Sequence, residues 1–142
     1  MNLSEHFTLE EMTFSETGAR AGIANQPGTL QFENLKRLAA MLEQVRELFG
    51  RPLIVTSAYR CSKLNKKIGS KPTSAHVNGL ACDFKVSGLT PREVCKIIAD
   101  SHVEFDQCIS EFGSWTHIGL AAVNRRQLLT INTSGTFPGL IA

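Results

Sequence analysis

The central segment of the chain, residues 74–84, carries side chains with the chemistry of metal ligands. His76 precedes Asp83 by seven positions, and Gly79 stands between them. An imidazole nitrogen and a carboxylate oxygen are both ligands that zinc accepts in proteins. Glycine adopts backbone conformations that are closed to other residues, so Gly79 allows the turn that brings His76 toward Asp83. The segment therefore predicts half of a zinc site.

The residues after Gly79 have the alternating pattern of a strand with one buried face. The apolar side chains expected on the core face are Leu80, Cys82, Phe84 and Val86. Asp83 falls on the opposite face, so we expect the site on the side of the sheet that points away from the core.

The C-terminal third supplies a candidate for the third ligand. Residues 105–111 and 115–120 have the composition of two strands, and the loop between them is three residues long with a central glycine. A loop of this kind favours a hairpin. His117 on the second strand is then available as the third ligand. Zinc with three protein ligands and an open fourth position is the arrangement found in catalytic sites.

Glu111 is the candidate general base. If Glu111 pairs with Trp115, then Ile109 lies opposite His117, and Glu111 becomes a diagonal neighbour of His117 on the same face. Diagonal neighbours lie about 7–8 Å apart, which is within reach of a glutamate side chain. A carboxylate at this distance is placed to accept a proton from water activated at the metal.

These two motifs together resemble the signature of the zinc D-Ala-D-Ala carboxypeptidase family of murein metallopeptidases. The residues that carry the resemblance are Ser74-x-His76-x-x-Gly79-x-Ala81-x-Asp83, followed by Trp115-x-His117. Residues 56–65, with Arg60 at their centre, are similar to the arginine segment of the same family. The family belongs to a wider group that shares its fold with the hedgehog signalling domain.

The resemblance implies one zinc ion held by His76, Asp83 and His117. It also implies Glu111 as the base. The expected substrate contacts are Arg60 and Ser74, and Tyr59 and Trp115 are expected either to pack in the core or to line the cleft. Several members of the family place the acidic base three residues before the last histidine, where this chain has Ser114. The assignment of Glu111 therefore depends on its facing and reach in the hairpin.

Composition agrees with one ordinary globular domain spanning residues 1–142. The chain has 42% hydrophobic residues and a mild net charge of +2, which does not argue for nucleic-acid binding, since that would need a clustered basic face. We expect a monomer that binds no nucleic acid and does not insert into a membrane, since no apolar run is long enough to span one. The four cysteines, which lack CxxC spacing, are expected to be mostly buried free thiols.

The other elements complete an α+β domain, in which helices pack on one face of a small, mainly antiparallel sheet. Residues 29–49 have the apolar stripe of a long helix, and a capping box at Thr90 begins another helix that reaches about residue 101. Residues 53–57 and 126–131 are expected as strands, residues 61–68 as a short basic helix, and residues 132–142 as a loop.

The sequence thus predicts a zinc-dependent peptidase that acts on the stem peptides of bacterial peptidoglycan. Relatives with the same ligands cleave D-Ala-D-Ala, D-Ala–diaminopimelate or L-Ala-D-Glu bonds, and the residues favour none of the three. The first residues lack a basic and apolar leader pattern. We therefore expect synthesis in the cytoplasm, release through a holin-type pore and action in the periplasm, as for single-domain endolysins of phages. The alternatives are a non-catalytic zinc-binding interaction module of the same fold, a host murein carboxypeptidase, and a virion-associated enzyme.

Overall fold

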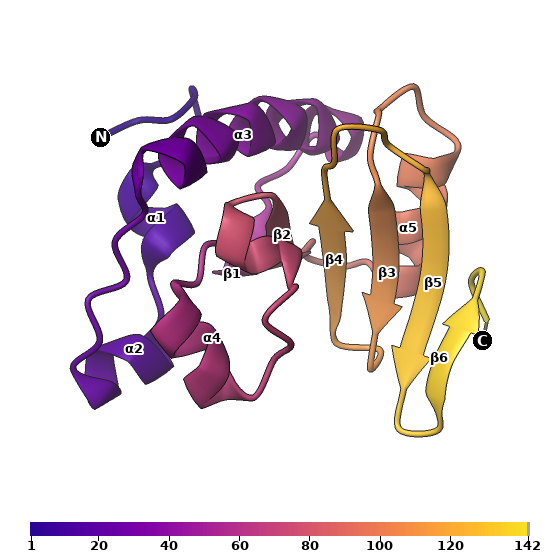
Figure 1. The fold of residues 1–142 in the computed structure, drawn as a ribbon. Coiled ribbons are helices and arrows are strands. Elements are labelled where there is room, and N and C mark those ends of the chain that lie inside the picture. The colour runs from indigo at the N-terminus through magenta and orange to yellow at the C-terminus, as the bar shows by residue number, and fades with distance from the viewer. Residues whose placement is uncertain (142) are drawn as a thin grey trace.

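The computed structural model describes residues 1–141 and builds them around one six-stranded sheet (Figure 1). The strands are β1 Ile54–Ser57, β2 Ala81–Lys85, β3 Gln107–Glu111, β4 Trp115–Gly119, β5 Gln127–Asn132 and β6 Gly135–Pro138. Their order across the sheet is β1-β2-β4-β3-β5-β6, and every neighbouring pair is antiparallel except β3 and β5. The predicted α+β class with a mainly antiparallel sheet is confirmed.

Five α-helices and one 3₁₀ helix complete the described part of the chain. They are α1 Leu9–Thr13, α2 Glu16–Ala21, α3 Thr29–Phe49, α4 Ser62–Ile68, the 3₁₀ helix η1 Ala75–Asn78, and α5 Pro91–Ala99. The long helix α3 crosses one end of the sheet, and α5 lies behind β3 and β5 (Figure 1). Among residues 1–141 no helix is long and apolar enough to cross a bilayer.

The helix ends follow from local chemistry. The Thr90 hydroxyl accepts a hydrogen bond from the Glu93 amide, and the Glu93 carboxylate accepts one from the Thr90 amide, so the predicted capping box begins α5. Helix α3 ends at Gly50, whose positive φ of 61° lets its amide close the last turn on Arg46. The predicted bounds of α3 are confirmed, and α5 ends at Ala99, slightly earlier than predicted.

One hydrophobic core joins α3 and α5 to the central strands. Leu38 and Leu42 of α3 are fully buried in the same cluster as Cys82 and Phe84 of β2. The core side chains that α5 contributes are also completely buried. They are Val94, Cys95 and Ile98. The predicted core face around β2 is therefore confirmed for Cys82, Phe84 and Val86, whereas Leu80 is only partly buried. Asp83 is left on the other face.

The hairpin of β3 and β4 has the predicted register. Glu111 pairs with Trp115, and Ile109 pairs with His117. On its other side β4 pairs with β2, where His117 lies directly opposite Asp83. The register of β4 between its two neighbours thus decides which side chains surround His117.

The prediction that residues 132–142 form a loop is wrong for residues 135–138, because β6 pairs with β5 at the edge of the sheet. The last residue of this range, 142, lies outside the described residues. The Asn132 side chain accepts a hydrogen bond from the Ser134 amide, which tightens the turn between the two strands. Thr130 of β5 also binds the segment, since its hydroxyl donates to the Gly139 carbonyl at 2.8 Å. A proline at residue 138 is compatible with an edge strand, because one side of such a strand has no partner.

Gly79 is the glycine on which this arrangement depends most, and it provides a stability test. Its φ is 73°, and a Cβ there would lie 2.7 Å from the Gln31 carbonyl oxygen of α3. We expect Gly79→Ala to lower the free energy of unfolding by about 3 kcal/mol, from left-handed backbone strain and from the clash. Gly69→Ala is the matched control, since φ is 88° but a Cβ meets nothing within 4 Å.

The control should cost only the backbone strain, about 1–2 kcal/mol. Urea denaturation followed by circular dichroism measures both variants. Equal losses would show that η1 does not press against α3 at Gly79.

Candidate metal centre

His76 is positioned by the short helix η1. The Ser74 hydroxyl accepts a hydrogen bond from the His76 amide, and Gly79 ends the helix with φ 73°. The His76 ring is 2% exposed, and its Nδ1 lies 2.6 Å from the carbonyl oxygen of Ala58. Because a carbonyl only accepts, Nδ1 donates this hydrogen bond, and Nε2 is the nitrogen that faces Asp83. This hydrogen bond orients the ring as a neighbouring acceptor orients the histidines of metal sites.

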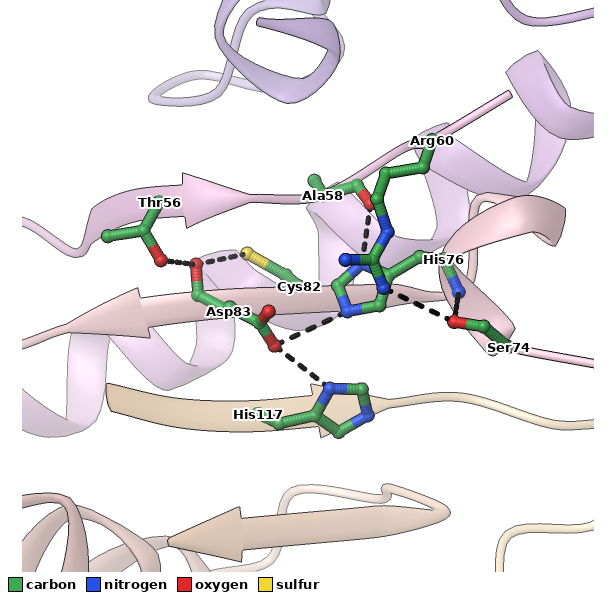
Figure 2. Close-up of polar contacts among 8 residues, drawn as sticks. All are labelled: Thr56, Ala58, Arg60, Ser74, His76, Cys82, Asp83 and His117. Atoms are coloured by element: carbon green, nitrogen blue, oxygen red, sulfur yellow. Dashed lines mark hydrogen bonds and ion pairs between the residues drawn. The ribbon is translucent and has the colours of Figure 1, made fainter. Parts of the chain in front are cut away.

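Asp83 and His117 are brought together by the pairing of β2 with β4. One oxygen of Asp83, Oδ1, lies 2.9 Å from His117 Nδ1 and 3.3 Å from His76 Nε2. Figure 2 shows the carboxylate between the two rings. Burial alone would raise the pKa of Asp83, but hydrogen bonds from the two imidazoles outweigh it and hold this pKa well below its usual range.

These three side chains form a compact group of donor atoms. Each contributes one ligand atom, and the three atoms lie within 4.8 Å of one another. Two imidazole nitrogens and one carboxylate oxygen are a donor set that suits zinc. The buried Asp83 carboxylate also favours a cation beside it, since a buried charge needs a partner. The residues therefore fit a zinc ion with three protein ligands.

The group lies at the bottom of an open cavity of about 580 Å³. Most of the residues that line it come from β2 and β4, from α4 and the segment that follows it, and from the end of β3 and the turn between β3 and β4. The lining residues are Arg60, Ile68, Gly69, Ser70, Ser74, His76, Asp83, Glu111, Phe112, Trp115 and His117. The cavity is large enough for several residues of a peptide, and it gives the metal group access to solvent.

Glu111 lies in this cavity and is not a member of the compact donor group. Its pKa is raised, because burial and the negative charge of Asp83 disfavour the charged form, and His117 and Arg60 offset only part of this effect. A carboxyl group with a raised pKa beside a metal group has the properties of a general base. Asp106, the other acidic residue near this hairpin, instead forms an ion pair with Arg125.

Arg60 reaches the same cavity from the segment after β1. Its Nη2 donates to the Ser74 hydroxyl at 3.4 Å (Figure 2). The backbone amide of Arg60 donates to the His76 carbonyl. Its Nε is buried, and among residues 1–141 it has no hydrogen-bond partner. Burial lowers the pKa of Arg60, and the charges of Asp83 and Glu111 oppose that shift. The guanidinium therefore keeps donor groups available beside the metal group.

The structure places most of the predicted site residues around one cavity. Ser74 and Trp115 line it as expected, but Tyr59 does not. Tyr59 is 6% exposed and belongs to the hydrophobic core, and its hydroxyl lies 3.4 Å from the Gln26 carbonyl oxygen. The expectation that Tyr59 contacts substrate is replaced by its alternative, a packing role. Strand periodicity ends before Tyr59, so the sequence carried no signal for its direction.

Three side chains of the cavity were not predicted from the sequence, namely Ile68, Ser70 and Phe112. Ile68 ends the basic helix α4, and its exposure depends on how that helix packs, which a seven-residue pattern does not reveal. Phe112 could have been found, because it lies in the predicted hairpin loop directly after Glu111. An aromatic residue at that position cannot reach the core and must lie near the base.

An α+β domain with a His–Asp–His group and a nearby carboxylate is an arrangement typical of zinc hydrolases. The family model described as Peptidase M15 matches residues 5–119, and this chain belongs to that family. M15 peptidases are zinc-dependent. The match includes every residue of the candidate site and confirms the resemblance found in the sequence, whereas β5 and β6 lie outside it. No curated protein matches the chain significantly.

The metal group can be tested by replacing its members one at a time. We expect His76→Ala, Asp83→Ala and His117→Ala each to abolish stoichiometric zinc binding, because three protein ligands leave none to spare. His102→Ala is the matched control, since His102 is exposed and lies outside the cavity. Zinc content is measured by inductively coupled plasma mass spectrometry on folded protein. Full zinc occupancy in the His117→Ala variant would show that the third ligand is a different residue.

Proposed function

We propose that this protein is a zinc-dependent peptidase that cleaves peptide bonds in the stem peptides of bacterial peptidoglycan. The observation that carries the proposal is the group of three ligand atoms within 4.8 Å, with Glu111 and Arg60 in the same cavity. Membership in Peptidase M15 supports the reaction class. The resemblance of the two sequence motifs to the murein carboxypeptidases supports the substrate.

His76, Asp83 and His117 would hold the metal. Zinc, when bound in such a site, lowers the pKa of a water ligand to about 7 and polarises a carbonyl group. Glu111 would accept the proton of the attacking water and deliver it to the amine that leaves. Its raised pKa favours this role, because a base that titrates nearer to neutral pH both accepts and returns a proton readily.

Arg60 would orient the substrate. Its guanidinium stays protonated in proteins and can donate two parallel hydrogen bonds to a carboxylate. Stem peptides carry carboxylates at their ends and side chains, so the cation gives the peptide one fixed point beside the metal group. Ser74 supports the cation, since its hydroxyl accepts from Arg60 and from the His76 amide. Fixing the peptide relative to the base lowers the barrier by removing rotational and translational freedom.

We further propose that the protein acts on the wall in the periplasm as a phage or prophage endolysin. This role is supported by the resemblance of the two sequence motifs to murein metallopeptidases. Its test is expression in a Gram-negative host, with and without a co-expressed pore-forming holin. Lysis that needs the pore agrees with the proposal, and lysis without it would contradict the expected route of release. Mass spectrometry of digested Gram-negative murein identifies the bond.

The need for metal separates an enzyme from a binding module. We expect EDTA to abolish hydrolysis of purified murein and added zinc to restore it, because the residues of the cavity offer no alternative to a metal-activated water. Product formation is followed by chromatography. Undiminished activity in EDTA would point to another mechanism, with Cys61 as the only thiol not fully buried. No hydrolysis of any murein by zinc-loaded protein would favour the interaction-module alternative.

Glu111→Gln tests the base. The amide keeps the size of the side chain but accepts no proton, so turnover should fall by roughly 10²–10⁴-fold while zinc stays bound. Glu104→Gln is the matched control, because Glu104 is exposed and lies outside the cavity. Near-normal kcat in the zinc-loaded Glu111→Gln variant would remove Glu111 from the mechanism.

A further inference from the structure

The turn between β3 and β4 holds an aromatic residue in a backbone conformation that aromatic residues avoid. Phe112 has φ 55°, and Gly113 after it has φ 61°. Two consecutive residues with positive φ are typical of the tight turns for which asparagine and glycine are preferred. A side chain with a Cβ is strained there, and a bulky one is a clear outlier. The turn would therefore be more stable with a different residue at position 112.

Packing against the rest of the protein does not explain the phenylalanine. Its side chain is 50% exposed, among the most exposed large apolar residues of the described chain. Its backbone amide donates to the Ile131 carbonyl at 2.8 Å, a bond that almost any residue could make. The ring contacts Trp115, with ring centroids 5.5 Å apart and planes tilted by 42°. Residues held in strained backbone conformations cluster at functional sites.

The position of the ring indicates what it binds. Phe112 and Trp115 both line the cavity of the metal group, and Phe112 directly follows Glu111. Ile68 of α4, which is 44% exposed, also lines the cavity. Most of the other lining residues are polar and include the metal ligands. A peptide in this cavity would have its backbone beside the polar residues and its alkyl groups against the apolar ones.

We propose that Phe112 is a substrate contact, whose ring binds an alkyl group of the peptide beside the scissile bond while Trp115 supports the ring from behind. This inference rests on the proposed function. In stem peptides the alkyl group is the methyl group of an alanine or the methylene chain of a diamino acid, and both offer the same C–H surface to an aromatic face. Because Phe112 follows Glu111 in the chain, a peptide held on this ring has its scissile bond near the base.

The proposal predicts that stability and substrate binding respond in opposite directions to one substitution. Phe112→Gly removes the strain and the ring together. We expect the melting temperature to stay the same or to rise by about 2–5 °C. We expect KM for a D-Ala-D-Ala pentapeptide to rise by about 5–20-fold, with kcat changed by less than about threefold. Phe112→Tyr, the matched control, keeps the ring and the strain and should match the wild type in both measurements.

A direct binding measurement accompanies the kinetics, because Trp115 is the only tryptophan of the chain. Its fluorescence reports on the contact with Phe112. Zinc-loaded Glu111→Gln protein is titrated with the pentapeptide, with and without Phe112→Gly. We expect a saturable change in fluorescence whose dissociation constant rises by about 5–20-fold when the ring is removed.

The outcomes separate this inference from the proposed function. Hydrolysis by the wild type together with an unchanged KM in the Phe112→Gly variant would overturn the inference and leave the peptidase intact. A melting temperature lowered by more than about 3 °C in that variant would show that the phenylalanine is a packing residue. If the wild type hydrolyses no murein peptide, the proposed function fails. The fluorescence titration then decides the inference by itself, since weaker binding without the ring supports it and an absence of binding overturns it.

Discussion

The structure depends most on one buried carboxylate, that of Asp83, which is held between two imidazole rings. Asp83 is 9% exposed and stands between Cys82 and Phe84, which are completely buried in the core. A carboxylate in such a place costs free energy unless it is paired. His76 and His117 provide that pairing at 3.3 Å and 2.9 Å. The strand β2 can therefore complete the core on one face only if both histidines are correctly placed on the other.

This requirement determines the register of the central strands. A shift of β2 by one residue would turn Asp83 into the core and bring Cys82 and Phe84 to the site. In the observed pairing Asp83 faces His117 on β4, and the same strand β4 sets Glu111 through its pairing with β3. Ligand and base are thus placed by one continuous ladder of hydrogen bonds. Burying the Asp83 charge in the core would cost free energy, and exposing Cys82 and Phe84 would lose apolar burial. Both effects therefore favour the observed register.

His76 reaches the carboxylate by a longer route, through α3. The Asn34 side chain of this helix donates to the Asn78 carbonyl at 2.9 Å, and Gly79 packs against the backbone of Gln31. The longest helix of the protein therefore holds η1 in place, although no residue of α3 lines the cavity. The carbonyl of Ala58, just after β1, then fixes the rotation of the His76 ring. Residues far apart in the sequence converge on one imidazole.

Much of this arrangement could be predicted from the sequence, because the decisive signals were local. Three signals were visible within a few residues of sequence. They are the alternation in β2, the three-residue loop after Glu111, and the spacing of His76 and Asp83. The errors occurred where geometry depends on partners distant in sequence. Strand β6 exists because β5 offers an edge for it, and its four residues have no periodicity of their own. The direction of Tyr59 is decided after an irregular step in β1, between Val55 and Ser57, where alternation no longer applies.

The two carboxylates of the cavity show how the environment divides their chemistry. Asp83 has two imidazole donors, and its pKa is held well below the usual range. Glu111 is partly buried and feels the charge of Asp83, and its pKa is raised. Two like groups whose pKa values are moved apart take different roles, one remaining charged as a ligand and one exchanging protons. Residue type does not distinguish an aspartate ligand from a glutamate base here. The distinction arises because β4 places His117 beside Asp83, while the turn after Glu111 leaves that side chain facing the open cavity.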